Sequence, residues 1–179
     1  PGCDVRIVDE EGREVGPGIH GEIVGRSEMM TEGYLNRPEA TFEASWFDVE
    51  GRRYQRSGDI GWRDEDGFIH VVDRKKDVII SGGFNIYASD IEQVLIAHPA
   101  VAECSVIAKA DEKWGETPVG FVSLTEVEAV SGTELCDWAN AQLGKYQRLA
   151  EVRVIDELPR NAAGKILKQN LKVRTLTEN

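Results

Sequence analysis

The sequence is poor in cysteine and lacks any long apolar run. Its three cysteines, Cys3, Cys104 and Cys136, are widely spaced and form no Cys-x-x-Cys pair. This pattern favours neither a disulfide framework nor a zinc site, and it fits a reducing cytoplasm. No run approaches the roughly 20 apolar residues of a membrane-spanning helix, and no charged and then apolar signal segment opens the chain. The sequence therefore predicts a cytoplasmic protein without a metal site or a transmembrane segment.

Basic charge is also scarce. The formal net charge is −11 at pH 7, which argues against a nucleic-acid partner because nucleic-acid binding needs a broad basic surface. The charge is uneven, however: ten acidic residues face two lysines between residues 81 and 142, whereas eight basic residues face four acidic ones after residue 142. The C-terminal tail is therefore either the place that receives a polyanionic ligand or a solvated basic helix.

The pattern of apolar runs and turn residues divides the chain into two parts. Hydrophobic residues make up 41% of the 179 residues, enough for a packed core. Before residue 74, short strands are expected at residues 5–8, 21–25 and 67–72, with one short helix that begins at Pro38. The chain starts with Pro1 and runs almost at once into a strand, as in a segment of a longer protein.

After the charged run at residues 73–77, the pattern changes from short strands and turns to alternating helices and strands. Two capping-box spacings predict helices, the first from Ser89 with Glu92 and the second from Ser131 with Glu134. The first helix should run through Leu95 and stop at His98-Pro99, and the second should extend to about Leu143. Strands are expected at residues 102–108, 119–124 and 152–155, which gives alternating strands and helices around a small sheet.

Three stretches carry more special residues than a core requires. Asp59 follows a glycine at the end of a strand candidate, and its carboxylate could accept both hydroxyls of a ribose; a turn aspartate is the alternative. In residues 74–86, a Ser-Gly-Gly turn would let a thin ligand approach the backbone and Arg74 could pair with phosphate or ribose; a plain hairpin beside a solvated charge run is the alternative.

The third stretch delivers Lys165 from a Pro-to-Gly loop just before an apolar and basic helix. Such a lysine could place its ammonium against a carboxylate and a phosphate at once, and an ordinary surface lysine is the alternative. The stretch is not a phosphate-cradling P-loop, because the glycine spacing differs and no Ser or Thr follows Lys165.

The motifs of these stretches resemble, in order and spacing, the late motifs of the adenylate-forming superfamily. They read Tyr-x-x-Ser-Gly-Asp, then Asp-Gly-Phe-Ile-His-Val-Val-Asp-Arg-Lys-Lys-Asp with Ile-Ile-Ser-Gly-Gly-Phe-Asn-Ile-Tyr, then Leu-Pro-Arg-x-x-x-Gly-Lys. With residues 33–41, the resemblance covers essentially the whole chain. The superfamily holds acyl- and aryl-CoA synthetases, firefly-type luciferases and the adenylation domains of nonribosomal peptide synthetases.

The resemblance implies an α+β fold with domain alternation. Residues 1–73 would form the β-barrel-like end of a large adenylating domain, and residues 74–76 a hinge. Residues 77–179 would form a small mobile C-terminal domain with a three-stranded sheet and flanking helices, which rotates between two half-reactions. The phosphate loop and the acid pocket of the family would lie upstream of Pro1, so the 179 residues alone are expected to be inactive.

The resemblance also assigns individual residues. Asp59 matches the aspartate that binds the ribose hydroxyls of the adenylate, and Arg74 matches an arginine that contacts the same ribose. Lys76 matches the hinge position. Gly82 and Gly83 match a strand that lines the pantetheine tunnel, where a side chain would block the thiol.

Three further assignments concern the reaction and CoA. Lys165 matches the adenylation lysine, which bridges the carboxylate of the acid and the α-phosphate. Trp114 matches an aromatic residue near CoA in some aryl-CoA ligases, with a buried structural tryptophan as the alternative. Related ligases usually have a Lys-Pro-Lys-like run for the CoA phosphates; residues 145–150 read Lys-Tyr-Gln-Arg-Leu-Ala instead, which leaves Arg148 as the candidate on that side.

The expected activity is that of an AMP-forming acyl-CoA synthetase, an acid–thiol ligase. Its substrates would be ATP, CoA and a carboxylic acid, either fatty (medium or long chain) or aromatic, with fatty acid metabolism as the expected setting. Mg²⁺ is expected with ATP, with ligands outside these residues. The alternatives are an adenylating enzyme whose acceptor is a carrier protein, and a non-catalytic interaction module. A lysine acetyltransferase that acts on Lys165 is a further expected partner, since acetylation would remove the charge.

Overall fold

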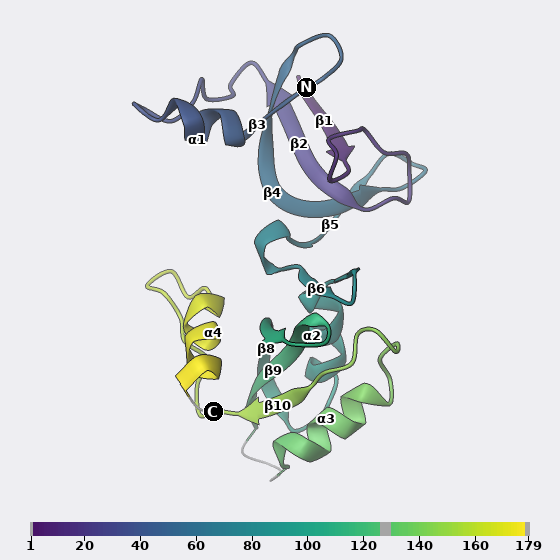
Figure 1. Ribbon diagram of the computed structural model, residues 1–179, viewed down its shortest axis with the longest axis vertical. Coiled ribbons are helices and arrows are strands. Elements are labelled where there is room, and N and C mark those ends of the chain that lie inside the picture. Colours follow the sequence, from purple (N-terminus) through teal and green to yellow (C-terminus); the bar gives the residue numbers. More distant parts are fainter. Residues whose placement is uncertain (1, 126–129, 178–179) are drawn as a thin grey trace. The chain divides into compact units, whose positions relative to one another are not determined.

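The computed structural model describes residues 2–125 and 130–177 of the chain. The chain divides into two compact units, Pro1–Lys76 and Asp77–Asn179, each with its own sheet (Figure 1). The mixed α+β class expected from the sequence is confirmed. In the part of the chain that the structure describes, no helix combines the length and the apolar composition needed to cross a membrane.

The first unit is an antiparallel sheet with one short helix. Its strand order is β1-β2-β4-β3, and β5 also pairs with β4. Within the described residues, no pairing closes this path into a barrel. The elements are β1 (Cys3–Val8), β2 (Gly21–Ser27), α1 (Pro38–Glu43), β3 (Ser45–Phe47), β4 (Arg53–Arg63) and β5 (Ile69–Arg74).

The core of this unit forms where β1, β2, β3 and β4 overlap. Val8 and Val24 are fully buried there, and the ring of Trp46 meets the ring of Tyr54 edge-on, with 5.1 Å between centroids. The predicted start of α1 at Pro38 is confirmed, since proline suits the first turn of a helix. The long strand β4 therefore serves as the support on which the end of β5 is held.

The second unit is built on a sheet of five strands within the described residues, two more than the sequence predicted. The three expected strands are β8 (Val101–Asp111), β9 (Gly115–Leu124) and β10 (Glu151–Val154), and β10 runs parallel to β9. The added pair is a hairpin of β6 (Ile79–Ser81) and β7 (Phe84–Ile86) that joins β9 at Ser81. Strands of three residues are too short to show the alternation that identifies a strand in a sequence.

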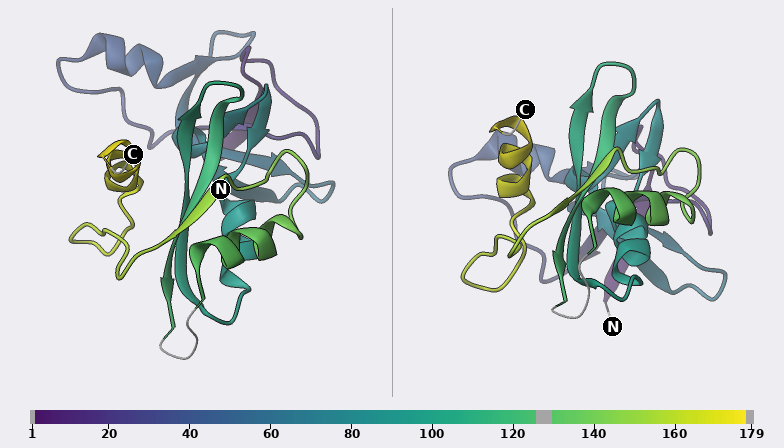
Figure 2. Two further views of the ribbon diagram at one scale, coloured as in Figure 1. Left: turned by 60° about the horizontal axis from the view of Figure 1, so that its bottom comes forward. Right: turned by 90° about the horizontal axis from the view of Figure 1, so that it is seen from below.

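Helices cover both faces of this second sheet (Figure 2). On one face α2 (Ala88–Ile96) and α3 (Gly132–Asn140) pack through Ile91, Leu95 and Leu135. On the other face α4 (Lys168–Thr177) packs through Leu171 against Leu158, Ile107 and Phe121. The segment that carries Lys165 therefore leads from the sheet into the helix on its second face.

One predicted capping box is confirmed and the other is wrong. Ser131 and Glu134 exchange the expected hydrogen bonds at the start of α3. In contrast, α2 begins at Ala88, so Ser89 lies inside its first turn and does not cap it. The carboxylate of Glu92 instead accepts the backbone N–H of Val106 at 2.8 Å, because it faces β8.

Candidate active site

Asp59 and Arg74 lie opposite each other on β4 and β5 of the first unit. Their Cα atoms are register partners, and Arg74 Nη1 lies 3.1 Å from Asp59 Oδ1. Asp59 sits within an 11-residue strand, not at a strand end as the sequence suggested. The preceding Gly58 has a φ of +72°, which bends the chain locally without ending the strand. The two residues expected at the nucleotide are thus brought together, and both are accessible.

The residue after Arg74 is also anchored. Lys75 Nζ donates to Glu22 Oε2 of β2 at 2.9 Å, and the same buried carboxylate accepts from Arg56 of β4. Lys75 opens a short 3₁₀ turn, Lys75–Asp77, in which Lys76 is exposed. Among the described residues, no carboxylate forms an ion pair with Lys76. The proposed hinge residue therefore follows directly on two residues that are held by carboxylates.

In the second unit, Gly82 and Gly83 form the two-residue turn between β6 and β7. Their φ angles are +56° and +84°, the left-handed values that a tight hairpin of this kind requires. The sequence-based assignment to a strand is therefore wrong in detail. The reason is that consecutive positive φ angles reverse the chain between Ser81 and Phe84, which pair with each other.

Trp114 lies against this turn. The backbone N–H of Gly82 donates to the Trp114 carbonyl oxygen at 2.8 Å, and a Cβ atom added to Gly82 would be 2.9 Å from Cε3 of the indole. The Lys113 ammonium lies 4.7 Å from the ring centroid. Trp114 is 47% exposed, so the alternative of a buried structural tryptophan is wrong. Glycine at position 82 is what allows the indole to lie there.

The loop that contains Arg148 is tied to the same hairpin by a ring stack. Tyr146 stacks on Phe84 of β7 with 4.2 Å between centroids, and both rings are about half exposed. Lys145 Nζ lies 5.9 Å from the centroid of the Tyr146 ring, and the Arg148 side chain is exposed. Phe84 and Tyr146 could not be identified from the sequence, because pairs of exposed aromatic residues that are distant in sequence leave no periodic signal. Gly82, Trp114 and the Arg148 loop thus share one surface region of the second unit.

Lys165 stands in a loop that is closed by its own hydrogen bonds. Asn161 N donates to the Lys165 carbonyl oxygen at 2.9 Å, and Asn161 Oδ1 accepts from Lys165 N at 2.9 Å and from Ala163 N at 3.0 Å. Gly164 supplies the left-handed turn, with a φ of +79°. Lys165 is exposed, and its ammonium forms no ion pair with another described residue. The loop therefore presents an available cation on a defined backbone.

Asn161 shapes the loop before Lys165, although it was not among the predicted site residues. An Asn that accepts from the backbone two and four residues ahead forms a local turn of its own. The signal was present in the Pro-Arg-Asn opening of the loop, since Asn and Pro both favour turns. Its position four residues before Lys165 gives it a direct role in the shape of the loop.

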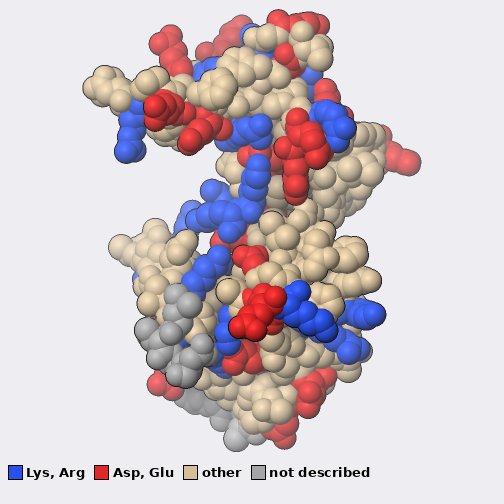
Figure 3. All heavy atoms as spheres, in the orientation of Figure 1, with Lys and Arg blue, Asp and Glu red and all other residues tan. Residues whose placement is uncertain are grey.

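The side chain of Cys104 on β8 is partly buried. Burial raises the pKa of the Cys104 thiol to about 12, with a further contribution from the Glu92 carboxylate. Within the described residues, no three His, Cys, Asp or Glu side chains lie together in a way that would hold a metal ion. Figure 3 shows acidic and basic side chains interspersed over the visible face.

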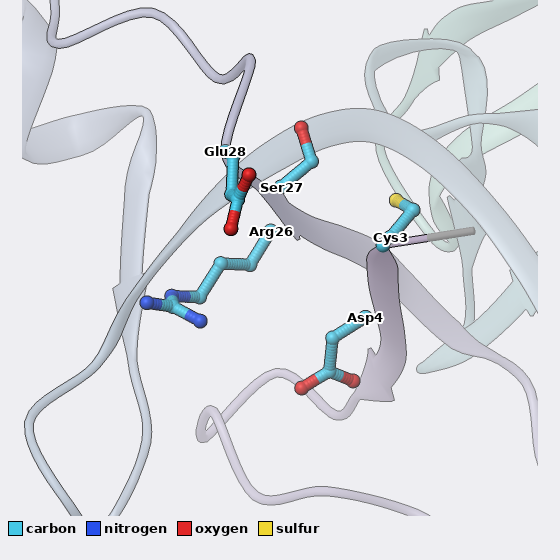
Figure 4. Close-up of a pocket in the computed structure, with 6 residues that line it drawn as sticks. Cys3, Asp4, Arg26, Ser27 and Glu28 are labelled. Atoms are coloured by element: carbon cyan, nitrogen blue, oxygen red, sulfur yellow. The ribbon is translucent and has the colours of Figure 1, made fainter.

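A shallow pocket beside β1 and β2 contains none of the predicted site residues (Figure 4). It is lined by Gly2, Cys3, Asp4, Arg26, Ser27 and Glu28. Tyr54 donates to Asp4 at 2.5 Å, and this bond lowers the pKa of the Asp4 carboxyl below its usual value. Asp4 is therefore engaged in holding β1 on β4.

The chain is similar in sequence to known adenylate-forming enzymes. Residues 90–165 match the family described as the AMP-binding enzyme C-terminal domain. The chain is 41% identical to the 2-succinylbenzoate–CoA ligase of Bacillus cereus over 173 residues, which are 95% of the chain and 34% of the relative. It is 40% identical to the ligase of the same name from Bacillus subtilis, over 95% of the chain and 33% of the relative. The chain thus spans about a third of the length of these curated relatives.

Solved structures give the same pattern. ATP-bound MatB from Rhodopseudomonas palustris has a TM-score of 0.90 at 31% identity, over 99% of this chain and 35% of that chain. The o-succinylbenzoate CoA synthetase of Bacillus subtilis, in complex with its acyl-adenylate intermediate, has a TM-score of 0.82 at 40% identity, over 96% of this chain and 34% of that one. An amide bond synthetase, McbA from Marinactinospora thermotolerans, has a TM-score of 0.85 at 30% identity.

Proposed function

This chain belongs to the adenylate-forming enzymes, through the C-terminal domain that its residues 90–165 match, and we propose that it serves an ATP-dependent acid:CoA ligase. Such an enzyme joins a carboxylate to AMP with loss of pyrophosphate, and then transfers the acyl group from AMP to the CoA thiol. In this proposal, the 179 residues supply the adenylation lysine, part of the ribose site and part of the CoA surface.

The observation that carries the proposal is the presentation of Lys165. Its ammonium stands on a hydrogen-bonded loop and has no competing ion pair among the described residues. A cation held in place where a carboxylate meets the α-phosphate stabilises the negative charge that is redistributed during the attack. By comparison with the loss of one oxyanion-hole donor, this contribution is roughly 3 to 4 kcal/mol.

The ribose site rests on Asp59 and Arg74. An ionised Asp accepts two hydrogen bonds through its two oxygens, which suits a pair of vicinal hydroxyls. Arg74 holds the carboxylate from one side, so that a ribose would approach from the other. The pair thus orients the nucleotide and takes no part in the bond changes.

CoA is the proposed acceptor because of the Gly82–Gly83 turn and its neighbours. Gly83 has no neighbour within 4 Å of where a Cβ atom would stand, which leaves room for a thin pantetheine chain beside the backbone. The exposed Trp114 ring offers a flat apolar surface next to the turn. Arg148 is proposed for the CoA phosphates, in place of the usual Lys-Pro-Lys-like run. The relatives named as CoA ligases support this acceptor.

The proposed acid is aromatic. The curated relatives are named 2-succinylbenzoate–CoA ligases, and this favours the aromatic over the fatty acid of the sequence-based expectation. Since the chain spans about a third of those relatives, the acid is proposed from their names and not from a pocket in this chain.

The experiment that tests the function uses a hybrid ligase, in which this chain replaces the matching residues of the Bacillus subtilis relative. We expect the hybrid to catalyse acid-dependent exchange between ATP and pyrophosphate and to form the CoA thioester of 2-succinylbenzoate. A second hybrid that takes only residues 77–179 controls for mismatched contacts within the large domain. If both hybrids fold but neither exchanges pyrophosphate, the proposed function is wrong.

The acceptor is tested in the same hybrid. Since one solved relative is named an amide bond synthetase, CoA is compared with an amine and with a phosphopantetheinylated carrier protein. Pyrophosphate exchange without CoA thioester formation, together with transfer to one of the other acceptors, would replace CoA in the proposal.

A further inference from the structure

The loop that carries Lys165 is tied to the sheet by one guanidinium. Arg160 Nη1 donates to the carbonyl oxygen of Gly164 at 2.6 Å, and Arg160 Nη2 donates to the carboxylate of Glu103 on β8. Arg160 thus bridges a strand of the sheet and the peptide immediately before Lys165. The backbone also pairs Arg160 with Ile166 as an isolated bridge, so the guanidinium spans the loop that this bridge closes.

The far end of the loop has an anchor of its own. Lys168, the first residue of α4, places Nζ 2.9 Å from Glu92 Oε1, and the same oxygen accepts the backbone N–H of Val106. Leu167 N donates to the Pro159 carbonyl oxygen at 2.7 Å. Both ends of the loop are therefore fixed to α2 and β8 through carboxylates, and the segment between them has little freedom to turn.

We propose that Arg160 and Glu103 are positioning residues for adenylation, in which Glu103 orients the Arg160 guanidinium and Arg160 sets the direction of the Gly164–Lys165 peptide. The inference rests on the proposed function, since it concerns where the Lys165 ammonium is delivered. A lysine has a long, flexible side chain, so the direction of its backbone decides which region the ammonium reaches. A displacement of about 1 Å at a reacting centre costs up to 10²-fold in rate.

The chemistry of arginine suits this role. A guanidinium presents several donors in a planar fork and can hold a carboxylate and a carbonyl oxygen at once, whereas a lysine ammonium on a flexible stem does not fix such a geometry. The side chains of Arg160 and Glu103 are 34% and 43% exposed. Exposed ion pairs contribute little to stability, so removal of this one should leave the fold intact and change the orientation of the loop.

The test compares Arg160→Gln and Glu103→Gln in the hybrid ligase with a matched control, Arg153→Gln. Arg153 forms an ion pair with Glu151 on β10 of the same sheet, with 2.9 Å between Nη2 and Oε1. We expect the first two variants to slow ATP/pyrophosphate exchange by about 10-fold or more, and to leave thioester formation from supplied acyl-adenylate unchanged. The control should change neither rate. Arg160→Lys should not restore exchange.

Combination with Lys165→Ala separates positioning from direct catalysis. If Arg160 acts through Lys165, Arg160→Gln should cause no further loss of exchange in the Lys165→Ala background. A further loss there would mean that Arg160 contacts the substrate itself, and an equal loss of both half-reactions would mean a structural role; either result overturns the proposal. If Lys165→Ala alone leaves exchange unchanged, the proposed function fails. If Lys165→Ala slows exchange and Arg160→Gln does not, only this inference fails.

Discussion

Arg74 reaches across from β5 to hold Asp59 of β4, with 3.1 Å between Nη1 and Oδ1. Because the two residues are register partners, the pairing depends on the register of the hairpin. A shift of one residue would move one of the side chains to the other face of the sheet. The hairpin thus sets the geometry of the proposed ribose site before any ligand binds.

We predict that Asp59→Asn in the hybrid ligase raises the KM for ATP by about 10-fold or more, because hydrogen bonds to a charged group contribute about 1.5 to 3 kcal/mol. The stability of the protein should change little. Asp64→Asn is the matched control. Asp64 lies in the turn of the same hairpin, and its Oδ2 is 2.7 Å from Nε2 of His70. Equal effects of the two substitutions on KM would contradict the ribose assignment.

For Lys165, the expected result is a loss confined to one half-reaction. Lys165→Ala should slow ATP/pyrophosphate exchange by at least about 100-fold, and spare thioester formation from synthetic acyl-adenylate and CoA. Acetylation of Lys165 should mimic the alanine, since it also removes the charge. Lys172→Ala on α4 is the control for the loss of one positive charge. A parallel fall in both half-reactions would show that Lys165 is structural or that the domain does not alternate.

The assignment of Lys76 as the hinge predicts the opposite result, a loss of thioester formation without a loss of adenylation. Proline fixes φ near −65°, so Lys76→Pro should restrict a rotation made at that residue. Adenylation should stay largely intact while thioester formation falls. Lys76→Ala, which removes the charge and leaves the backbone free, should affect neither step. The two rates are measured separately, as for Lys165, and an equal loss of both in the proline variant refutes the assignment.

Gly82 and Gly83 offer an internally matched pair. Both have positive φ, so an alanine at either position would strain the backbone. Only at Gly82 would the new Cβ meet a neighbour, Cε3 of the Trp114 indole at 2.9 Å. Gly82→Ala should therefore displace Trp114, change its fluorescence and slow thioester formation. Gly83→Ala should lower stability through backbone strain alone, without the change in fluorescence. Indistinguishable spectra would show that the contact does not set the position of the indole.

Much of the fold was predictable because its signals are local. The capping box at Ser131 and the proline at the start of α1 depend on residues within four positions of each other. The failed box at Ser89 had the same local pattern, but there the Glu92 carboxylate is drawn to β8 and Lys168, both distant in sequence. Local patterns therefore predict a helix more reliably than they predict what its polar side chains contact.

In the candidate site, too, local sequence patterns were predictable and contacts between distant residues were not. Asp59, Arg74 and Lys165 were predicted from motifs, whereas the carboxylates that hold their neighbours Lys75 and Arg160 lie far away in the sequence. Glu22 precedes Lys75 by 53 positions, and Glu103 precedes Arg160 by 57. The stack of Tyr146 on Phe84 is of the same kind, since the two rings meet only after β7 and the loop before β10 are in place. Such partners follow from the tertiary fold and not from spacing.

The anchoring of Arg74 and Lys75 also bears on how the chain meets a protease. Trypsin cleaves after basic residues, and it encounters three in succession here, Arg74, Lys75 and Lys76. The first two have their charged groups engaged by Asp59 and Glu22, whereas the third is exposed in a short turn at the boundary of the two units. Cleavage should therefore begin after Lys76, and sequencing of the new N-terminus, expected at Asp77, would locate where the chain becomes accessible.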